Sequence, residues 1–228
     1  MNPVPTPVLP ASKGGLGGED AARLADHLRR GGLVVFPTET VYGLGALAEG
    51  AGLETVLTLK GRDASRPIPI LVSGPNALGG LVLDDLSAVL AAVFWPGPLT
   101  LVLDDPEGRF PLGVRSADGG VAVRVSSSPV ASAIVGGLGG PLTATSANRA
   151  GEAPATDLAS ALAVAGRLGG AGRAIWVVDG GRLQQSPPST VVDCRSGAVS
   201  IVREGAVPAA DVRRAALAGR QGEAATRG

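Results

Sequence analysis

The chain has 228 residues, which is long enough for a full hydrophobic core in one large domain or two small ones. Hydrophobic residues make up 45% of it and charged residues 18%, a composition that excludes an intrinsically disordered chain. Twenty basic and twenty acidic residues cancel, so no overall field attracts nucleic acid or a membrane surface, although a local basic groove is compatible with this balance.

The two ends of the chain lack a regular apolar pattern. Four prolines and four glycines in residues 1–18 predict a flexible leader, and residues 218–228 are expected to form a flexible tail. No linker or repeat divides residues 19–217, which we expect to form one domain. The amino terminus does not resemble a signal peptide, and the single cysteine, Cys194, fits a reducing compartment, so we expect a cytoplasmic protein that does not contact a membrane.

Short runs of β-branched residues alternate with segments rich in alanine and leucine. The segment "EDAARLADHLRR" at 19–30 predicts an amphipathic helix, because its apolar residues share one face, its acids come first and its arginines last. Helices are also predicted at 52–59, 84–94, 129–135, 157–167 and 208–217, and strands at 33–36, 68–72, 99–103, 121–125, 142–145, 175–179, 189–193 and 198–203. This alternation favours an α/β fold with a mixed sheet, in which the closely spaced last strands pair antiparallel.

The segment "VVFPTETVYGLGA" at 34–46 is a buried strand that stops at Pro37 and is followed by Thr-Glu-Thr. From Gly43 onward the sequence matches G-x-G-x-x-A, with Asp63 about 20 residues later, as in nicotinamide-cofactor sites. That motif needs its first glycine at the turn from strand to helix, whereas six residues separate this strand from Gly43. A plain tight turn explains the glycines but not the polar residues at the strand's carboxyl end, which is where open α/β sheets bind ligands.

The segment "LKGRDASRP" at 59–67 contains three cations. Eighteen of the twenty basic residues are arginine, and the two lysines are Lys13, in the leader, and Lys60. Lys60 in so arginine-rich a chain indicates a place where a compact ammonium is needed and a planar guanidinium does not serve. The alternative for Lys60, Arg62 and Arg66 is a solvated helix end, where cations are also favoured.

The segment "PLTATSANRAGEAPATD" at 141–157 places hydroxyl and amide side chains, including Ser146 and Asn148, after a short strand. Such groups bind phosphate or the edge of a base. The alternative is a turn before a helix that is capped near Thr156 or Asp157.

Conventional catalytic groups are scarce. The one histidine, His27, lies beside the apolar face of the first predicted helix, and Cys194 then has no imidazole to activate it. No His/Cys cluster indicates a transition-metal site. An enzyme with these residues would work by positioning and charge neutralisation, as phosphate-transferring sites do.

Seven blocks occur in the order seen in the YrdC-domain family: "FPTETVYGLG", "KGR" with "RPIPILV", "FWPGPLTLVL", "VAVRV", "TSAN..G", "PSTVVD" and "IVREG". The chain therefore resembles the short, single-domain members of that family over roughly residues 18–210. The resemblance implies one YrdC-like α/β domain, a twisted mixed parallel and antiparallel sheet with flanking helices and a concave ligand groove.

The family includes threonylcarbamoyl-AMP synthases, so the resemblance implies a nucleotidyltransferase. Such an enzyme joins L-threonine, bicarbonate and ATP into L-threonylcarbamoyladenylate and releases pyrophosphate. The product serves the threonylcarbamoyl modification of tRNA adenosine 37, which implies a downstream tRNA threonylcarbamoyl transferase machinery as partner, with tRNA itself a further candidate. Mg²⁺ is implied together with ATP and needs few protein ligands, so no side chain is assigned to a metal and none as an acid or base.

The resemblance also implies the site residues. The threonine-binding positions are Thr38, Arg124 and Ser189, and the ATP-binding positions are Lys60, Arg62, Ala144, Ser146, Asn148 and Arg203. Arg124 would pair with the carboxylate of threonine, a task that suits a bidentate donor.

Three positions depart from the family pattern. Leu71 stands where some longer members have a histidine, Ser128 replaces the usual histidine before a proline, and Ala150 replaces a frequent serine. These departures leave two alternatives. One is a YrdC-like module that binds RNA through phosphates without chemistry, and the other is a carbamoyl-adenylate enzyme with another acceptor.

Overall fold

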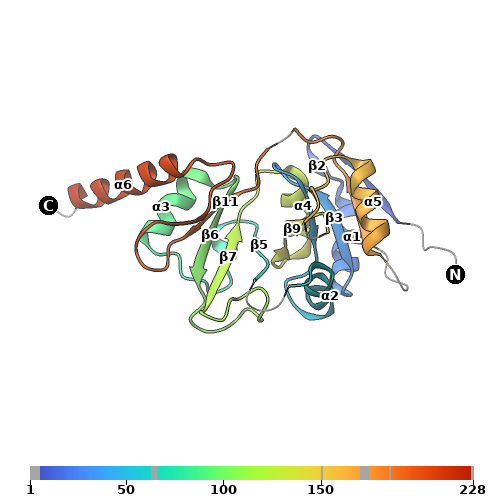
Figure 1. Ribbon diagram of the computed structural model, residues 1–228, viewed down its shortest axis with the longest axis horizontal. Helices are drawn as coiled ribbons and strands as arrows, with labels where there is room; N and C mark the ends of the chain where they lie inside the picture. Colours follow the sequence, from blue (N-terminus) through green and yellow to red (C-terminus); the bar gives the residue numbers. More distant parts are fainter. Residues whose placement is uncertain (1–5, 63–65, 150, 170–174, 185, 227–228) are drawn as a thin grey trace.

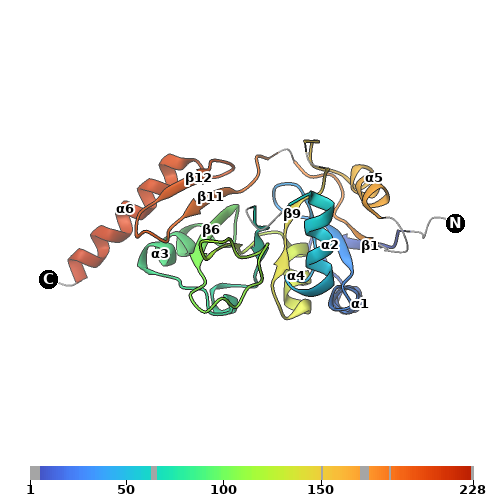
Figure 2. The same cartoon turned by 60° about the horizontal axis from the view of Figure 1, so that its bottom comes forward.

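The structure of the chain, a computed structural model, describes residues 6–62, 66–149, 151–169, 175–184 and 186–226. Within these residues twelve strands form two six-stranded mixed sheets, and six α-helices pack around them. The two sheets lie side by side along the long axis of the molecule (Figures 1 and 2). The observed architecture therefore confirms the mixed α/β class but divides the expected single sheet into two.

The first sheet has parallel strands at its centre and antiparallel strands at its edges. Its order is β2 (Gly15–Leu16), β1 (Val8–Ser12), β10 (Ile175–Asp179), β3 (Leu33–Pro37), β4 (Tyr42–Gly45) and β9 (Thr145–Ser146). β1, β10 and β3 are parallel, and the remaining pairs are antiparallel. The apolar run of β3 is buried along its whole length because side chains cover both faces of this sheet.

Helices cover the two faces of the first sheet with separate apolar clusters. α1 (Gly18–Arg29) and α4 (Pro129–Leu138) pack together over one face, where they meet Val34 and Phe36 of β3. α5 (Leu158–Leu168) covers the other face, where Leu33 and Val35 belong to the cluster. Successive residues of β3 therefore enter opposite clusters, as the pleat of a strand requires.

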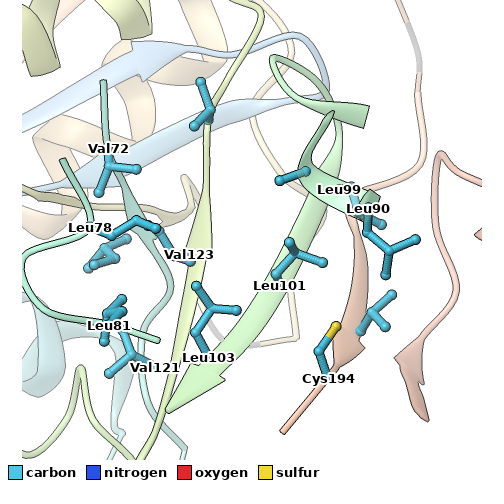
Figure 3. Close-up of a cluster of buried hydrophobic side chains, with 14 of the residues drawn as sticks. Val72, Leu78, Leu81, Leu90, Leu99, Leu101, Leu103, Val121, Val123 and Cys194 are labelled. Atoms are coloured by element: carbon cyan, nitrogen blue, oxygen red, sulfur yellow. The ribbon is translucent and has the colours of Figure 1, made fainter. Parts of the chain in front are cut away.

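The second sheet is packed by helices on one face. Its order is β12 (Ser200–Arg203), β11 (Thr190–Asp193), β6 (Leu99–Asp104), β7 (Gly120–Arg124), β5 (Ile70–Leu71) and β8 (Leu142–Thr143). α3 (Asp85–Phe94) packs against β6 and against α6 (Ala209–Thr226), and a single 3₁₀ turn, η1 (Pro75–Ala77), precedes them. Figure 3 shows Leu99, Leu101, Leu103, Val121 and Val123 in the core on this side.

The two sheets meet at β8 and β9, which follow one another in the chain but enter different sheets. Ala144 separates them. Across this junction the amide of Thr143 donates to the carbonyl of Ala46 at 2.8 Å, and the amide of Ala46 donates to Oγ1 of Thr143 at 2.9 Å. α2 (Gly50–Lys60) adds a second link, because its Leu53 belongs to the core of the second sheet and its Val56 to that of the first.

The helices predicted from sequence are all found, and capping side chains and a glycine mark several of their ends. Asp84, Ser128 and Asp157 are the N-caps of α3, α4 and α5, and each side chain accepts a bond from a backbone amide of the first turn. Gly61 ends α2 in a left-handed conformation with a φ of 55°. α6 begins as predicted but continues to residue 226, nine residues beyond the predicted end.

The predicted strands at 68–72 and 198–203 are found in shorter form, as β5 and β12. The strands differ further from the prediction in three places. Residues 42–45 form strand β4 and not a tight turn, because Gly43 and Gly45 let it lie close to Phe36 and to the carbonyl of Thr143. The predicted strand at 142–145 is divided into β8 and β9. The expected leader contains β1 and β2, since β1 extends the parallel part of the sheet beside β10. The division into leader, domain and tail stays a prediction.

No helix in the described part of the chain combines the length and the apolar character that a membrane crossing requires.

Candidate functional site

A cavity of about 400 Å³ lies on the face of the second sheet opposite to its packed core. Successive strand residues point to opposite faces, so Leu101 and Val123 enter the core (Figure 3). Their neighbours Thr100 and Arg124 line the cavity. The strands that supply the core on one face of the sheet therefore supply the floor of the cavity on the other.

Both sheets and the chain after α2 contribute to the walls. Seven of the nine residues implied by the family resemblance line this cavity, namely Thr38, Arg62, Arg124, Ala144, Ser146, Ser189 and Arg203. The other two, Lys60 and Asn148, are buried and lie directly behind Ser146, to which both are hydrogen bonded. The structure thus brings together all nine residues from six separate parts of the sequence.

The described lining of the cavity is cationic. Arg62, Arg124 and Arg203 line it, and no aspartate or glutamate does. Desolvation lowers the pKa of Arg62, with smaller effects from the charges of Arg66 and Arg203. Arginine nevertheless stays protonated in proteins, so the cavity keeps three guanidinium groups suited to an anionic ligand, although Arg124 is paired with an acid outside the lining.

Arg124 is held by an acid that the sequence analysis did not single out. Its Nη1 lies 3.1 Å from Oε1 of Glu39, and the two side chains are 8% and 16% exposed. The other oxygen of Glu39 accepts a hydrogen bond from the hydroxyl of Ser126. Desolvation lowers the pKa of Arg124, while the charge of Glu39 opposes that effect. The signal that could have revealed Glu39 is its place between two threonines at the end of β3.

Thr38 ends β3 in a hydrogen-bonded turn. Its Oγ1 donates to the carbonyl of Val41 at 2.7 Å and accepts from the amides of Thr40 and Val41. This turn fixes Glu39 beside Arg124, because the hydroxyl of the residue before Glu39 accepts from the amides of the two residues after it.

Ser189 and Arg203 form the opposite wall. Nη2 of Arg203 donates to the carbonyl of Ser189 at 2.7 Å and to its hydroxyl at 3.3 Å. That hydroxyl also lies 2.9 Å from Oγ1 of Thr100. These bonds join β12 and β6 to the residue before β11 at the edge of the cavity.

Lys60 is the last residue of α2 and is 8% exposed. Its Nζ donates to the carbonyl of Ser146 at 3.1 Å, to the carbonyl of Asn148 at 2.8 Å and to Oδ1 of Asn148 at 2.7 Å. Burial, with a smaller effect from the charge of Arg62, lowers the pKa of Lys60 to about 8.

Residues that the sequence analysis set aside lie elsewhere. His27 stacks on Trp176 with ring centroids 4.6 Å apart, and Cys194 is buried after β11, where desolvation raises its thiol pKa to about 12. Of the departures, Leu71 lines the cavity and Ser128 caps α4 while its Oγ donates to the carbonyl of Pro37. Ala150 lies outside the described residues, as does Asp63 of the apparent cofactor motif.

The described residues contain no group of three or more His, Cys, Asp or Glu side chains that could hold a metal ion. What the arrangement offers chemically is positive charge, hydroxyl groups and backbone amides around an open volume.

Comparison with known proteins identifies related chains. The model of the Sua5/YciO/YrdC family, described as "Telomere recombination", matches residues 26–205. The chain is similar to the threonylcarbamoyl-AMP synthase of Chromohalobacter salexigens, with 37% identity over 185 residues that cover 78% of this chain and 96% of that protein. It is also similar to the threonylcarbamoyl-AMP synthase of Xanthomonas axonopodis pv. citri, with 34% identity over 79% of this chain and 96% of that one.

Two solved structures have closely similar folds. Pyrococcus abyssi Sua5 complexed with L-threonine gives a TM-score of 0.81 at 28% identity and covers 93% of this chain, which corresponds to 61% of that protein. Escherichia coli YciO gives a TM-score of 0.77 over 90% of this chain and 98% of that one. Its identity is 22%, so this likeness concerns the fold alone.

Proposed function

We infer the activity of this chain from its relatives, since it belongs to the Sua5/YciO/YrdC family. Its curated relatives are named threonylcarbamoyl-AMP synthases, and it spans nearly their whole length. The chain is an enzyme that makes threonylcarbamoyl-AMP from L-threonine, bicarbonate and ATP. The alternatives, an RNA-binding module without chemistry and a carbamoyl-adenylate enzyme with another acceptor, have no comparable support.

The observation that carries this function is the cavity lined by three arginines and no described acid. The free amine of threonine condenses with bicarbonate to a carbamate, and the lost oxygen and protons leave as water. A carbamate oxygen then attacks the α-phosphate of ATP while pyrophosphate leaves. Both reacting groups are anions, so lowering their repulsion is the main task of the protein. Fixed guanidinium groups perform this task without giving or taking a proton, which agrees with the lack of a histidine beside the cavity.

We assign roles to individual residues from the family motifs, and their positions in the cavity support the assignment. Arg124, held on one side by Glu39, binds the carboxylate of threonine, and Thr38 and Ser189 bind the rest of this small substrate. Arg62 and Arg203 neutralise the phosphates, while Ser146 and the backbone at Ala144 line the nucleotide side. Mg²⁺ enters with ATP, because phosphate oxygens and water supply most of its preferred ligands. The adenylate product would then pass to a tRNA threonylcarbamoyl transferase.

The test is mass spectrometry of the product after incubation with threonine, bicarbonate and MgATP. We expect threonylcarbamoyl-AMP, together with pyrophosphate release that requires threonine. Equal pyrophosphate release with serine, with glycine or with no amino acid would contradict the assignment. Binding of duplex RNA with no turnover of ATP would instead favour the RNA-binding alternative.

A further inference from the structure

The ammonium of Lys60 has no hydrogen left for a ligand in the geometry observed. A lysine ammonium carries three donors, and Nζ of Lys60 uses them for the carbonyls of Ser146 and Asn148 and for Oδ1 of Asn148. All three acceptors belong to one short segment, residues 146–148, and all three distances are at most 3.1 Å.

The acceptor segment is itself tied to the rest of the site. Oδ1 of Asn148 also accepts from the hydroxyl of Ser146 at 2.7 Å, and Nδ2 of Asn148 donates to the carbonyl of Glu152 at 2.6 Å. The amide of Ala147 donates to the carbonyl of Tyr42 in β4. Ser146 and the two residues before it, Ala144 and Thr145, line the cavity.

We propose that Lys60 is a positioning residue that holds residues 146–148 in the shape needed for ATP, and that it is not a ligand of the phosphates. The role of Lys60 in ATP binding rests on the proposed function, whereas its role in holding residues 146–148 does not. The chain keeps a lysine here because three carbonyl oxygens converge on one point, which a tetrahedral ammonium can satisfy and a planar guanidinium cannot. Arg62, two residues later and on the cavity wall, then supplies the charge that meets the phosphates.

The first test is hydrogen–deuterium exchange of the ligand-free protein, read on peptides that cover residues 145–149. Lys60→Met should speed exchange in this segment about tenfold or more, since it removes charge-assisted hydrogen bonds. Lys60→Arg should do the same although it keeps the charge. Arg62→Met is the matched control, because Arg62 has the same charge but donates to the carbonyl of Pro67. It should leave exchange in this segment unchanged.

The second test is a double-mutant cycle on ATP affinity, measured by calorimetry with Mg²⁺ and without threonine. Lys60→Met and Asn148→Ala should each weaken ATP binding about tenfold, and the double variant should lose no more than about threefold further, since both act through one segment. Arg62→Met combined with Asn148→Ala should give close to the product of the single effects.

Unchanged exchange in Lys60→Met together with lost ATP affinity would overturn the proposal, as would full additivity in the Lys60–Asn148 cycle. If Lys60→Met does not fold, Asn148→Ala in the exchange experiment replaces it, and unchanged exchange there has the same meaning. A protein that binds ATP as expected but makes no threonylcarbamoyl-AMP would contradict the proposed function alone. If the parent does not bind ATP, the exchange result still decides the role of Lys60.

Discussion

Arg124 is a single charge that faces Glu39 on one side and the proposed threonine carboxylate on the other. Arg124→Ala should weaken threonine binding about tenfold to a hundredfold, because a charge-assisted pair contributes about 1.5–3 kcal/mol. ATP affinity should change much less, since Arg62 and Arg203 remain. Calorimetry with each substrate measures both effects. Unchanged threonine affinity would remove Arg124 from the substrate site.

Glu39 gives a separate prediction about stability. Glu39→Gln keeps the size of the side chain but leaves the buried guanidinium of Arg124 without its charged partner. We expect the free energy of unfolding in urea to fall by about 1–3 kcal/mol. Glu107→Gln is the matched control, because Glu107 pairs with Arg109 at side-chain exposures of 61% and 57%. That substitution should change the free energy of unfolding by less than about 0.5 kcal/mol. Equal effects of the two substitutions would contradict the importance of the buried pair.

The sequence of β4 was compatible with either a strand or a tight turn, and substitution of its glycines tests the strand. A Cβ at Gly45 would lie 2.3 Å from the carbonyl oxygen of Thr143 and 3.0 Å from Phe36, so Gly45→Ala must separate the strands where the two sheets meet. We expect a loss of about 1–3 kcal/mol in the free energy of unfolding. The control is Gly136→Ala inside α4, where a Cβ would meet nothing within 4 Å. It should stabilise the protein by about 0.5–1 kcal/mol, because alanine favours a helix. If Gly45→Ala were as stable as the parent, the close approach of β4 to β8 would be wrong.

Elements with a clear local pattern could be predicted from the sequence, and those set by distant partners could not. The period of α1 and the N-cap of α3 are local signals, and both elements are found where they were expected. β4 depends on Thr143, which approaches its Gly45 from far along the chain, and β1 depends on β10, more than 160 residues away. Neither partner is visible in a short window of sequence.

The candidate site followed the same rule. The family motifs supplied the nine residues, and the structure places them around or directly behind one cavity. Motifs alone could not distinguish a cation that lines the cavity from one whose donors are already used, as for Arg62 and Lys60. The pairing of Glu39 with Arg124 joins residues 85 positions apart, one after β3 of the first sheet and one at the end of β7 of the second.

At the scale of the whole molecule, the chain passes repeatedly between the two sheets. The first sheet takes β1 to β4, then β9 and β10, whereas the second takes β5 to β8, then β11 and β12. No single cut of the chain therefore separates the two sheets, and the cavity needs residues from both. Because the chain alternates between the sheets in this way, we expect that neither sheet stays folded when the other unfolds.

The last prediction is that both sheets unfold in one transition, although a chain of this length exceeds the usual range of two-state domains. The two tryptophans allow a direct test. Trp176 lies in β10 of the first sheet, and Trp95 follows α3 and packs against the core of the second. Trp95→Phe leaves a reporter in the first sheet alone, and Trp176→Phe leaves one in the second. For each variant, unfolding in urea should have the same midpoint by tryptophan fluorescence and by far-ultraviolet circular dichroism. We expect this agreement because the junction of Ala46 with Thr143 and the packing of α2 couple the two cores. If the fluorescence midpoint fell below the dichroism midpoint in one variant and above it in the other, the sheets would be separate folding units.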